Sequence, residues 1–181
     1  NTINILMPVS ITISVLQFYK SKVKDQKFIN EYNLYCLPFL VFFLIIALKF
    51  KYILDFKLLV GLLLVFSSIL ILNKRRFSSF KKTFFKLKKL VLIAIGCVHG
   101  LTNMGGSFLA IYSTLVSLNK KEVARFYICY GYLIMGILQY ITVLFLSFEL
   151  LEFTKLFYIL LALVVYFPSQ TLFVNIKDKK F

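Results

Sequence analysis

The succession of long apolar runs constrains this chain more than any other feature of its sequence. A helix that crosses the hydrocarbon of a bilayer needs roughly 17–25 predominantly apolar residues. The runs that reach or approach this length are residues 3–19, 34–50, 58–73, 90–118, 123–147 and 156–174. Because backbone groups find no water in lipid, and no strand-like alternation is present, these runs must be helical. The sequence therefore predicts an all-α integral membrane protein, built as a polytopic helix bundle.

Composition and charge support this interpretation and exclude several soluble classes. Of 181 residues, 60% are hydrophobic and 16% are charged, whereas soluble domains are typically about 45–50% apolar and about 25% charged. Soluble nucleases, kinases and secreted disulfide scaffolds match this composition poorly. The net charge of +15 would favour nucleic acid if it covered one soluble face. Here the cations fall in short runs between apolar segments, so the expected partner is membrane lipid and not nucleic acid.

The distribution of these cations predicts an orientation in the membrane. The connection 49–57 has three lysines with Asp55, and 148–155 has Lys155 beside Glu149 and Glu152. The strongly basic segments are 20–33, 74–89, 119–125 and the C-terminal tail. By the positive-inside rule, the strongly basic segments lie in the cytoplasm. We therefore expect a multi-pass protein of the cell membrane, which in a bacterium is the inner membrane.

This orientation makes residues 90–118 enter and leave the membrane on the same side. The run has 29 residues, which is long for one span and short for two. One interpretation is a broken or re-entrant hairpin, with a helix to about Leu101, an irregular turn, and a second helix from about Ser107. The other is a single long tilted span, which would place 119–125 outside the cell. The sequence leaves both open.

The middle of this run, His99–Ser107, is the most polar and glycine-rich stretch within any span. A second helix that starts at Gly105-Gly106-Ser107 would present free N–H groups and the positive end of its dipole, which together favour an anion. The side chains of Thr102 and Asn103 would orient the ligand. Broken helices near the middle of the membrane are where many secondary transporters bind their substrates.

Each of these residues also has a purely structural interpretation. Small residues in a span often serve close helix packing, and Ser107 could simply cap the second helix. His99 is either a proton-linked group or a satisfied core residue, and as the only histidine it is a poor metal ligand. Arg125 either supplies positive charge to an anion or anchors its helix at the membrane interface. Cysteines lie in apolar segments without CxxC spacing, so we expect small buried hydrophobes at Cys36, Cys97 and Cys129.

A family resemblance sharpens the transporter interpretation. The stretch Gly100–Leu109, a short helix, and then Leu118–Arg125 resemble the second-repeat signature of the sulfite exporter TauE/SafE family, although Asn103 stands where glycine is common. The resemblance implies a permease for sulfite, sulfonates or similar anions, built from two homologous halves. It places the remainder of the first repeat at 1–73, a basic cytoplasmic loop at 74–89 and the second repeat at 90–181. It also implies a partial chain, with the first glycine motif before Asn1 and the last helix after Phe181.

The sequence thus predicts one transmembrane domain over residues 1–181, with the two-repeat transporter architecture. Its expected function is secondary transport of a small anion such as sulfite or an organosulfonate, by alternating access at the broken helix. The substrate-binding residues would be Thr102, Asn103, Gly105, Gly106, Ser107 and Arg125, with His99 as a proton-linked group. The alternative is a non-transporting membrane scaffold or subunit whose glycines serve packing only. No motif indicates an enzyme, a cofactor or a metal, and the sequence leaves homo-oligomerisation open.

Overall fold

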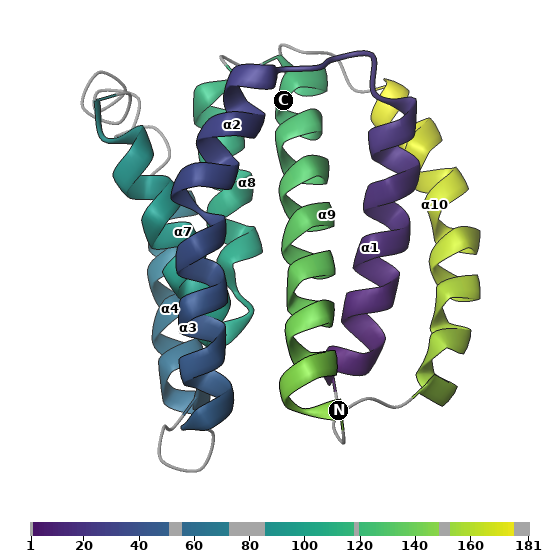
Figure 1. Ribbon diagram of the computed structural model, residues 1–181. Coiled ribbons are helices and arrows are strands. Elements are labelled where there is room, and N and C mark those ends of the chain that lie inside the picture. Colours follow the sequence, from purple (N-terminus) through teal and green to yellow (C-terminus); the bar gives the residue numbers. More distant parts are fainter. Residues whose placement is uncertain (1, 51–55, 73–85, 118–119, 149–152, 176–181) are drawn as a thin grey trace. The chain divides into compact units, whose positions relative to one another are not determined.

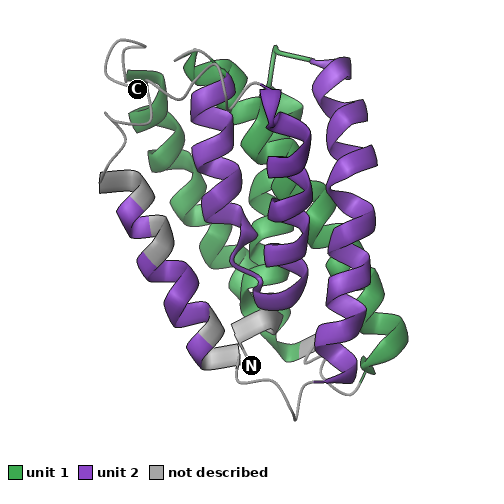
Figure 2. Cartoon of the chain, turned by 90° about the vertical axis from the view of Figure 1, so that its left-hand side faces the viewer, with its two compact units in different colours: residues 1–24, 117–181 green, residues 25–116 purple. Residues whose placement is uncertain are grey.

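The computed structural model describes residues 2–50, 56–72, 86–117, 120–148 and 153–175 (Figure 1). Within these residues, every element of regular secondary structure is a helix. The chain forms two compact units, residues 1–24 with 117–181 and residues 25–116, which Figure 2 shows in different colours. Most of the basic loop expected at 74–89 lies outside the described residues.

The unit formed by residues 25–116 contains α2 (Gln26–Tyr35), α3 (Leu37–Lys49), α4 (Phe56–Leu72), α7 (Lys88–Thr102) and α8 (Gly105–Val116). Asp25 caps α2, because its Oδ1 accepts a hydrogen bond from the Phe28 N–H at 3.1 Å. Together α2 and α3 make one candidate membrane span, Gln26–Lys49. The span begins before the predicted run at residue 34, and sequence hydropathy missed its start because α2 is mostly polar and buries only Phe28 and Tyr32.

Glycines allow α3 and α7 to pack backbone to backbone. A Cβ added at Gly96 would collide with the Cys36 carbonyl oxygen, and one at Gly100 would lie 2.5 Å from the Leu40 carbonyl oxygen. Leu40 and Leu92 are fully buried in the same unit. Since backbone atoms cannot move aside as a flexible side chain can, these two positions on α7 require the absence of a side chain.

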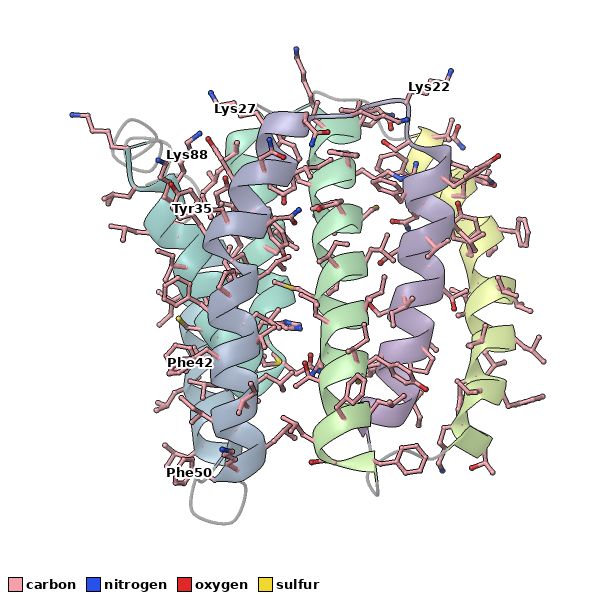
Figure 3. All side chains as sticks on the ribbon, viewed as in Figure 1. Lys22, Lys27, Tyr35, Phe42, Phe50 and Lys88 are labelled. Atoms are coloured by element: carbon pink, nitrogen blue, oxygen red, sulfur yellow. The ribbon has the colours of Figure 1, made fainter. Side chains whose placement is uncertain are left out.

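An ion pair joins α2 to the start of α7. Lys88 Nζ lies 2.6 Å from Glu31 Oε1 and 2.8 Å from Glu31 Oε2. Figure 3 shows Lys27 and Lys88 at one end of this unit and Phe50 at the other, with Phe42 between them on α3. Phe42 is 58% exposed. A cationic end and an exposed aromatic flank are the arrangement expected where one end meets water and the flank meets lipid.

The other unit contains α1 (Thr2–Lys20), α9 (Lys121–Leu146), a short 3₁₀ helix η3 (Phe153–Phe157) and α10 (Tyr158–Asn175). In this unit α1 packs against both α9 and α10 (Figure 1). A Cβ at Gly136 would lie 2.8 Å from Ile11 Cγ1, so this glycine brings α9 close to α1. Nearer the end of α1, the ring of Phe18 stacks on Phe126 with centroids 5.8 Å apart.

Three helical stretches of the described residues are long and apolar enough to cross a membrane: Gln26–Lys49, Lys121–Leu146 and Thr154–Asn175. Large apolar side chains point outward along the last of them, where Val164 is 69% exposed and Leu172 is 68% exposed. In water such a surface would be unfavourable, whereas in a bilayer it contacts lipid. The prediction of an all-helical membrane protein is confirmed at this level.

Candidate functional site

The glycine-rich segment of unit 25–116 contains a sharp interruption between two helices. α7 ends at Thr102, and α8 begins at Gly105. Between them Asn103 takes the left-handed conformation, with φ of 61°, which asparagine tolerates better than most residues. The irregular part is shorter than the turn expected before Ser107. Both glycines therefore belong to α8, and no described glycine has a positive φ.

The hydroxyl groups of Thr102 and Ser107 stabilise this interruption. Thr102 Oγ1 donates to the Val98 carbonyl at 2.7 Å and accepts from the Met104 N–H at 3.3 Å. Ser107 Oγ donates to the Met104 carbonyl at 2.9 Å. Each hydroxyl proton is thus already used by the backbone. Because an anion needs donors, neither hydroxyl can serve it without giving up a bond at the break.

The start of α8 presents backbone donors that the helix itself cannot satisfy. Gly105 and Gly106 are buried, and in the described residues their N–H groups form no hydrogen bond. The next N–H, that of Ser107, reaches the Met104 carbonyl at 3.4 Å. The first N–H groups of any helix lack intrahelical partners, and they lie at the positive end of the helix dipole. Two N–H groups at buried glycines are therefore without a partner among the described residues.

After the interruption the chain folds back along α7. A Cβ at Gly105 would collide with His99 Cβ and would lie 2.9 Å from the Ile95 carbonyl oxygen. Further along α8, the ring of Tyr112 lies 6.4 Å from that of Phe28 at the start of α2. α7 and α8 therefore form a hairpin, and α8 returns toward the end of the unit at which α2 begins.

His99 lies one turn before the interruption and is buried, with 5% of its surface exposed. Its Cβ occupies the space beside Gly105, so it packs directly against the start of α8. The described residues contain no group of three His, Cys, Asp or Glu side chains that could hold a metal ion. A proton-linked role for His99 stays a prediction.

The remaining predicted site residue, Arg125, belongs to the other unit. It lies on the second turn of α9, beside a cavity of about 240 Å³. The side chains that line this cavity come from α1, α9 and α10, and they are Gln17, Arg125, Ile128, Cys129, Ser169, Gln170 and Phe173. The structure therefore groups His99, Thr102, Asn103, Gly105, Gly106 and Ser107 in one unit and gives Arg125 polar neighbours of its own.

Two glutamines determine the chemistry of this cavity. Arg125 Nη2 donates to Gln170 Oε1 at 2.7 Å, and the guanidinium lies over the ring of Phe173 at 4.6 Å from its centroid. Cys129 was expected as a small buried hydrophobe; it is 2% exposed, and its thiol donates to Gln17 Oε1 at 2.8 Å. Both amide oxygens are thus occupied, which leaves both amide NH₂ groups available.

Further cations surround the C-terminal part of α10. Lys121 Nζ donates to the Val174 carbonyl at 3.2 Å, and Lys20 Nζ lies 5.2 Å from the centroid of the Tyr166 ring. Cations are favoured at this end of a helix, where the dipole is negative and carbonyls lack intrahelical partners. The ammonium of Lys121 satisfies such a carbonyl directly, so that role does not fall to Arg125.

Sequence reasoning found Arg125 but missed Gln17, Ser169 and Gln170. A usable signal existed, because each is a polar residue inside an otherwise apolar run near its basic end. Nothing in the sequence, however, shows that residues 17, 125 and 170 meet. These residues are far apart along the chain, and only the packing of α1, α9 and α10 brings them to one cavity.

Comparison with known protein families, with curated protein sequences and with solved structures gives no match to this chain. The resemblance to the TauE/SafE family therefore rests on Gly100–Leu109 and Leu118–Arg125 alone. It stays a prediction, as do the repeat boundaries and the substrate class derived from it.

Proposed function

We propose that this protein is a secondary transporter for a small anion, a permease of the TauE/SafE type that moves sulfite or an organosulfonate across the cell membrane. The proposal is carried by one observation, the buried and unsatisfied N–H groups of Gly105 and Gly106 at the start of α8. Burying an N–H group without a hydrogen-bond partner is unfavourable by about 2–7 kcal/mol, depending on the reference solvent. A water or an anion at this point offsets that cost, and the helix dipole favours the anion.

The geometry refines the roles of the proposed binding residues. Gly105 and Gly106 supply backbone donors, and the amide of Asn103 orients the ligand from the turn. Thr102 and Ser107 hold the break open through their bonds to Val98 and Met104. Arg125 belongs to the other unit, where it lines the cavity with Gln17 and Gln170, and its charge is the part of the proposed site that favours an anion there.

The lengths of α7 and α8 favour a re-entrant hairpin. At about 1.5 Å per residue, the 15 residues of α7 extend for about 22 Å and the 12 residues of α8 for about 18 Å. Each is shorter than the roughly 30 Å of hydrocarbon. We therefore infer that both enter from the cytoplasmic side and that the break lies within the membrane. The repeat hypothesis makes the N-terminal helix the counterpart of residues 123–147; these helices, α1 and α9, pack on each other.

The decisive test places a negative charge at the break without disturbing the fold. In proteoliposomes, Asn103→Asp should lower the initial rate of sulfite transport by at least about tenfold, equivalent to about 1.4 kcal/mol, because a carboxylate repels the anion. Aspartate tolerates the left-handed conformation as asparagine does. Asn30→Asp, at an exposed position of α2, is the control with the same charge change and should transport normally. If the wild type, Asn103→Asp and Asn30→Asp transport sulfite at equal rates, the anion does not bind at the break.

A specific observation also favours the alternative, a non-transporting scaffold. Gly96, Gly100 and Gly105 each face backbone or Cβ atoms at distances that exclude a side chain, so packing alone accounts for their presence. This alternative predicts no sulfite transport by the wild-type protein and no dependence of its thermal stability on sulfite, sulfate, taurine or sulfoacetate. Binding to the native state would instead stabilise it, by about 2.7 kcal/mol at one hundred times Kd.

A further inference from the structure

The cavity around Arg125 combines a charged donor with neutral amides and, among the described residues, holds no carboxylate. Arg125 is only partly exposed, and in the part of the chain that the structure describes it forms no ion pair with a carboxylate. Its guanidinium has five N–H donors. One donates to Gln170, and the thiol of Cys129 is a second side-chain partner. Removing a charge partly from water without a counter-ion is unfavourable. The cavity is therefore electrostatically incomplete as it stands.

The orientation of the two amides extends this donor set. A guanidinium can only donate, so Gln170 must turn its oxygen toward Arg125 and its NH₂ away. The thiol of Cys129 likewise engages the oxygen of Gln17. Neither NH₂ group has a hydrogen-bond partner among the described residues. Three residues with N–H donors, one each from α1, α9 and α10, thus line one cavity, and both side-chain amide oxygens are already bonded.

We propose that this cavity is an oxyanion site, separate from the helix break and located at the end of unit 1–24 with 117–181 that carries Lys20 and Lys121. The guanidinium of Arg125 binds two oxygens of a sulfur or phosphorus oxyanion in the fork geometry that arginine favours. The NH₂ groups of Gln17 and Gln170 bind the remaining oxygens. The volume of about 240 Å³ accommodates such an ion with several waters, since each water occupies about 30 Å³ in the liquid.

The same chemistry can come from two sources, a free oxyanion or the phosphate of a lipid headgroup. A free anion would make the cavity a cytoplasmic station of the transport path, and this part of the inference rests on the proposed function. A lipid phosphate would make it a site that anchors α1, α9 and α10 to the bilayer surface. Oxyanion binding itself depends on neither role.

Gln170→Glu is the sharpest variant because it replaces the proposed ligand by a built-in anion. The new carboxylate can pair with Arg125 at the position where Oε1 now accepts, so we expect the fold to be retained and thermal stability to be equal or higher. Sulfate should bind at least about tenfold more weakly, because loss of a charged hydrogen-bond partner typically has an effect of this size. Arg125→Gln should weaken sulfate binding equally. Lys120→Gln, at an exposed position with the same charge change, should leave sulfate binding unchanged.

Binding is measured by calorimetry with sodium sulfate against sodium chloride at equal ionic strength, on detergent-purified protein in the Asn103→Asp background. That background removes the proposed break site, so failure of the transport proposal and failure of this inference give different results. A parallel arm compares nanodiscs of phosphatidylcholine alone with nanodiscs that contain phosphatidylglycerol. If sulfate binds in phosphatidylcholine nanodiscs but not when phosphatidylglycerol is present, the cavity binds lipid phosphate. If sulfate binds in both kinds of nanodisc, the cavity binds a free anion. Sulfate binding that Gln170→Glu and Arg125→Gln leave unchanged, or no binding above chloride in either membrane, overturns the proposal.

Discussion

At the scale of single residues, Asn103 decides the shape of the glycine-rich segment. It alone among described non-glycine residues has a positive φ, and its N–H closes α7 through a bond of 2.8 Å to the His99 carbonyl. The adjoining Gly105 and Gly106 both lie in helical conformation within α8, so the left-handed turn depends on Asn103 and not on glycine. An asparagine at the turn combines tolerance of this conformation with an amide that can reach a ligand.

A pair of substitutions at Asn103 separates conformation from chemistry. Asn103→Ala should lower the free energy of unfolding by about 1 kcal/mol, since a left-handed conformation disfavours a residue with a Cβ. Asn103→Gly should leave stability unchanged or slightly higher. Both substitutions remove the side-chain amide, so both should weaken anion binding to a similar degree if Asn103 contacts the anion. Thermal unfolding in detergent measures the first effect, and proteoliposome transport the second; an alanine variant as stable as the glycine variant would contradict the argument.

At the scale of elements, close contact between helices depends on glycines that face backbone. Gly96 and Gly100 lie four residues apart on α7, which places both on one face of the helix toward α3. In a membrane, helices gain little from the hydrophobic effect against one another, so association relies on van der Waals contact at short distance. The glycine spacing on α7 is therefore a packing device, independent of what the hairpin binds.

The glycine at residue 61 provides a matched control for this packing. Gly100→Ala should reduce stability by about 1–3 kcal/mol, the usual cost of overpacking, because its Cβ would meet the backbone of Leu40 and Leu44. Gly61→Ala on α4 meets nothing within 4 Å and should be neutral or stabilising by up to about 1 kcal/mol. Thermal unfolding of the two variants in the same detergent compares them directly. Equal midpoints would show that α3 and α7 do not pack as described.

At the scale of the whole molecule, the chain divides between two units that do not follow its order. Residues 1–24 pack with 117–181, and residues 25–116 form the other unit. The predicted repeats, 1–73 and 90–181, concern homology between halves, which this packing does not test. What the arrangement supplies is a hairpin whose two flanks, near Lys86 and Lys120, should lie on one side of the membrane.

Cysteine labelling tests this topology in the membrane. In a background with Cys36, Cys97 and Cys129 replaced, Lys86→Cys and Lys120→Cys should both react with a membrane-impermeant maleimide only from the cytoplasmic side. Both positions are exposed, so the reagent can reach them without unfolding. Labelling of residue 120 from outside would mean that α7 and α8 together cross the membrane once.

The helical membrane character of this chain could be derived from the sequence, since apolar run lengths and backbone hydrogen bonding in lipid are local properties of the chain. Glycine and polar residues also marked Thr102–Ser107 as a place where a helix could break, but the sequence left a single long span open. Two further features depend on how the helices pack: Gly96 and Gly100 meet the backbone of α3, and Gln17 and Gln170 line the same cavity as Arg125. These are contacts between segments up to 153 residues apart, as residues 17 and 170 are. Side-chain contacts at that range depend on how helices pack, and hydropathy along a single chain carries no record of it.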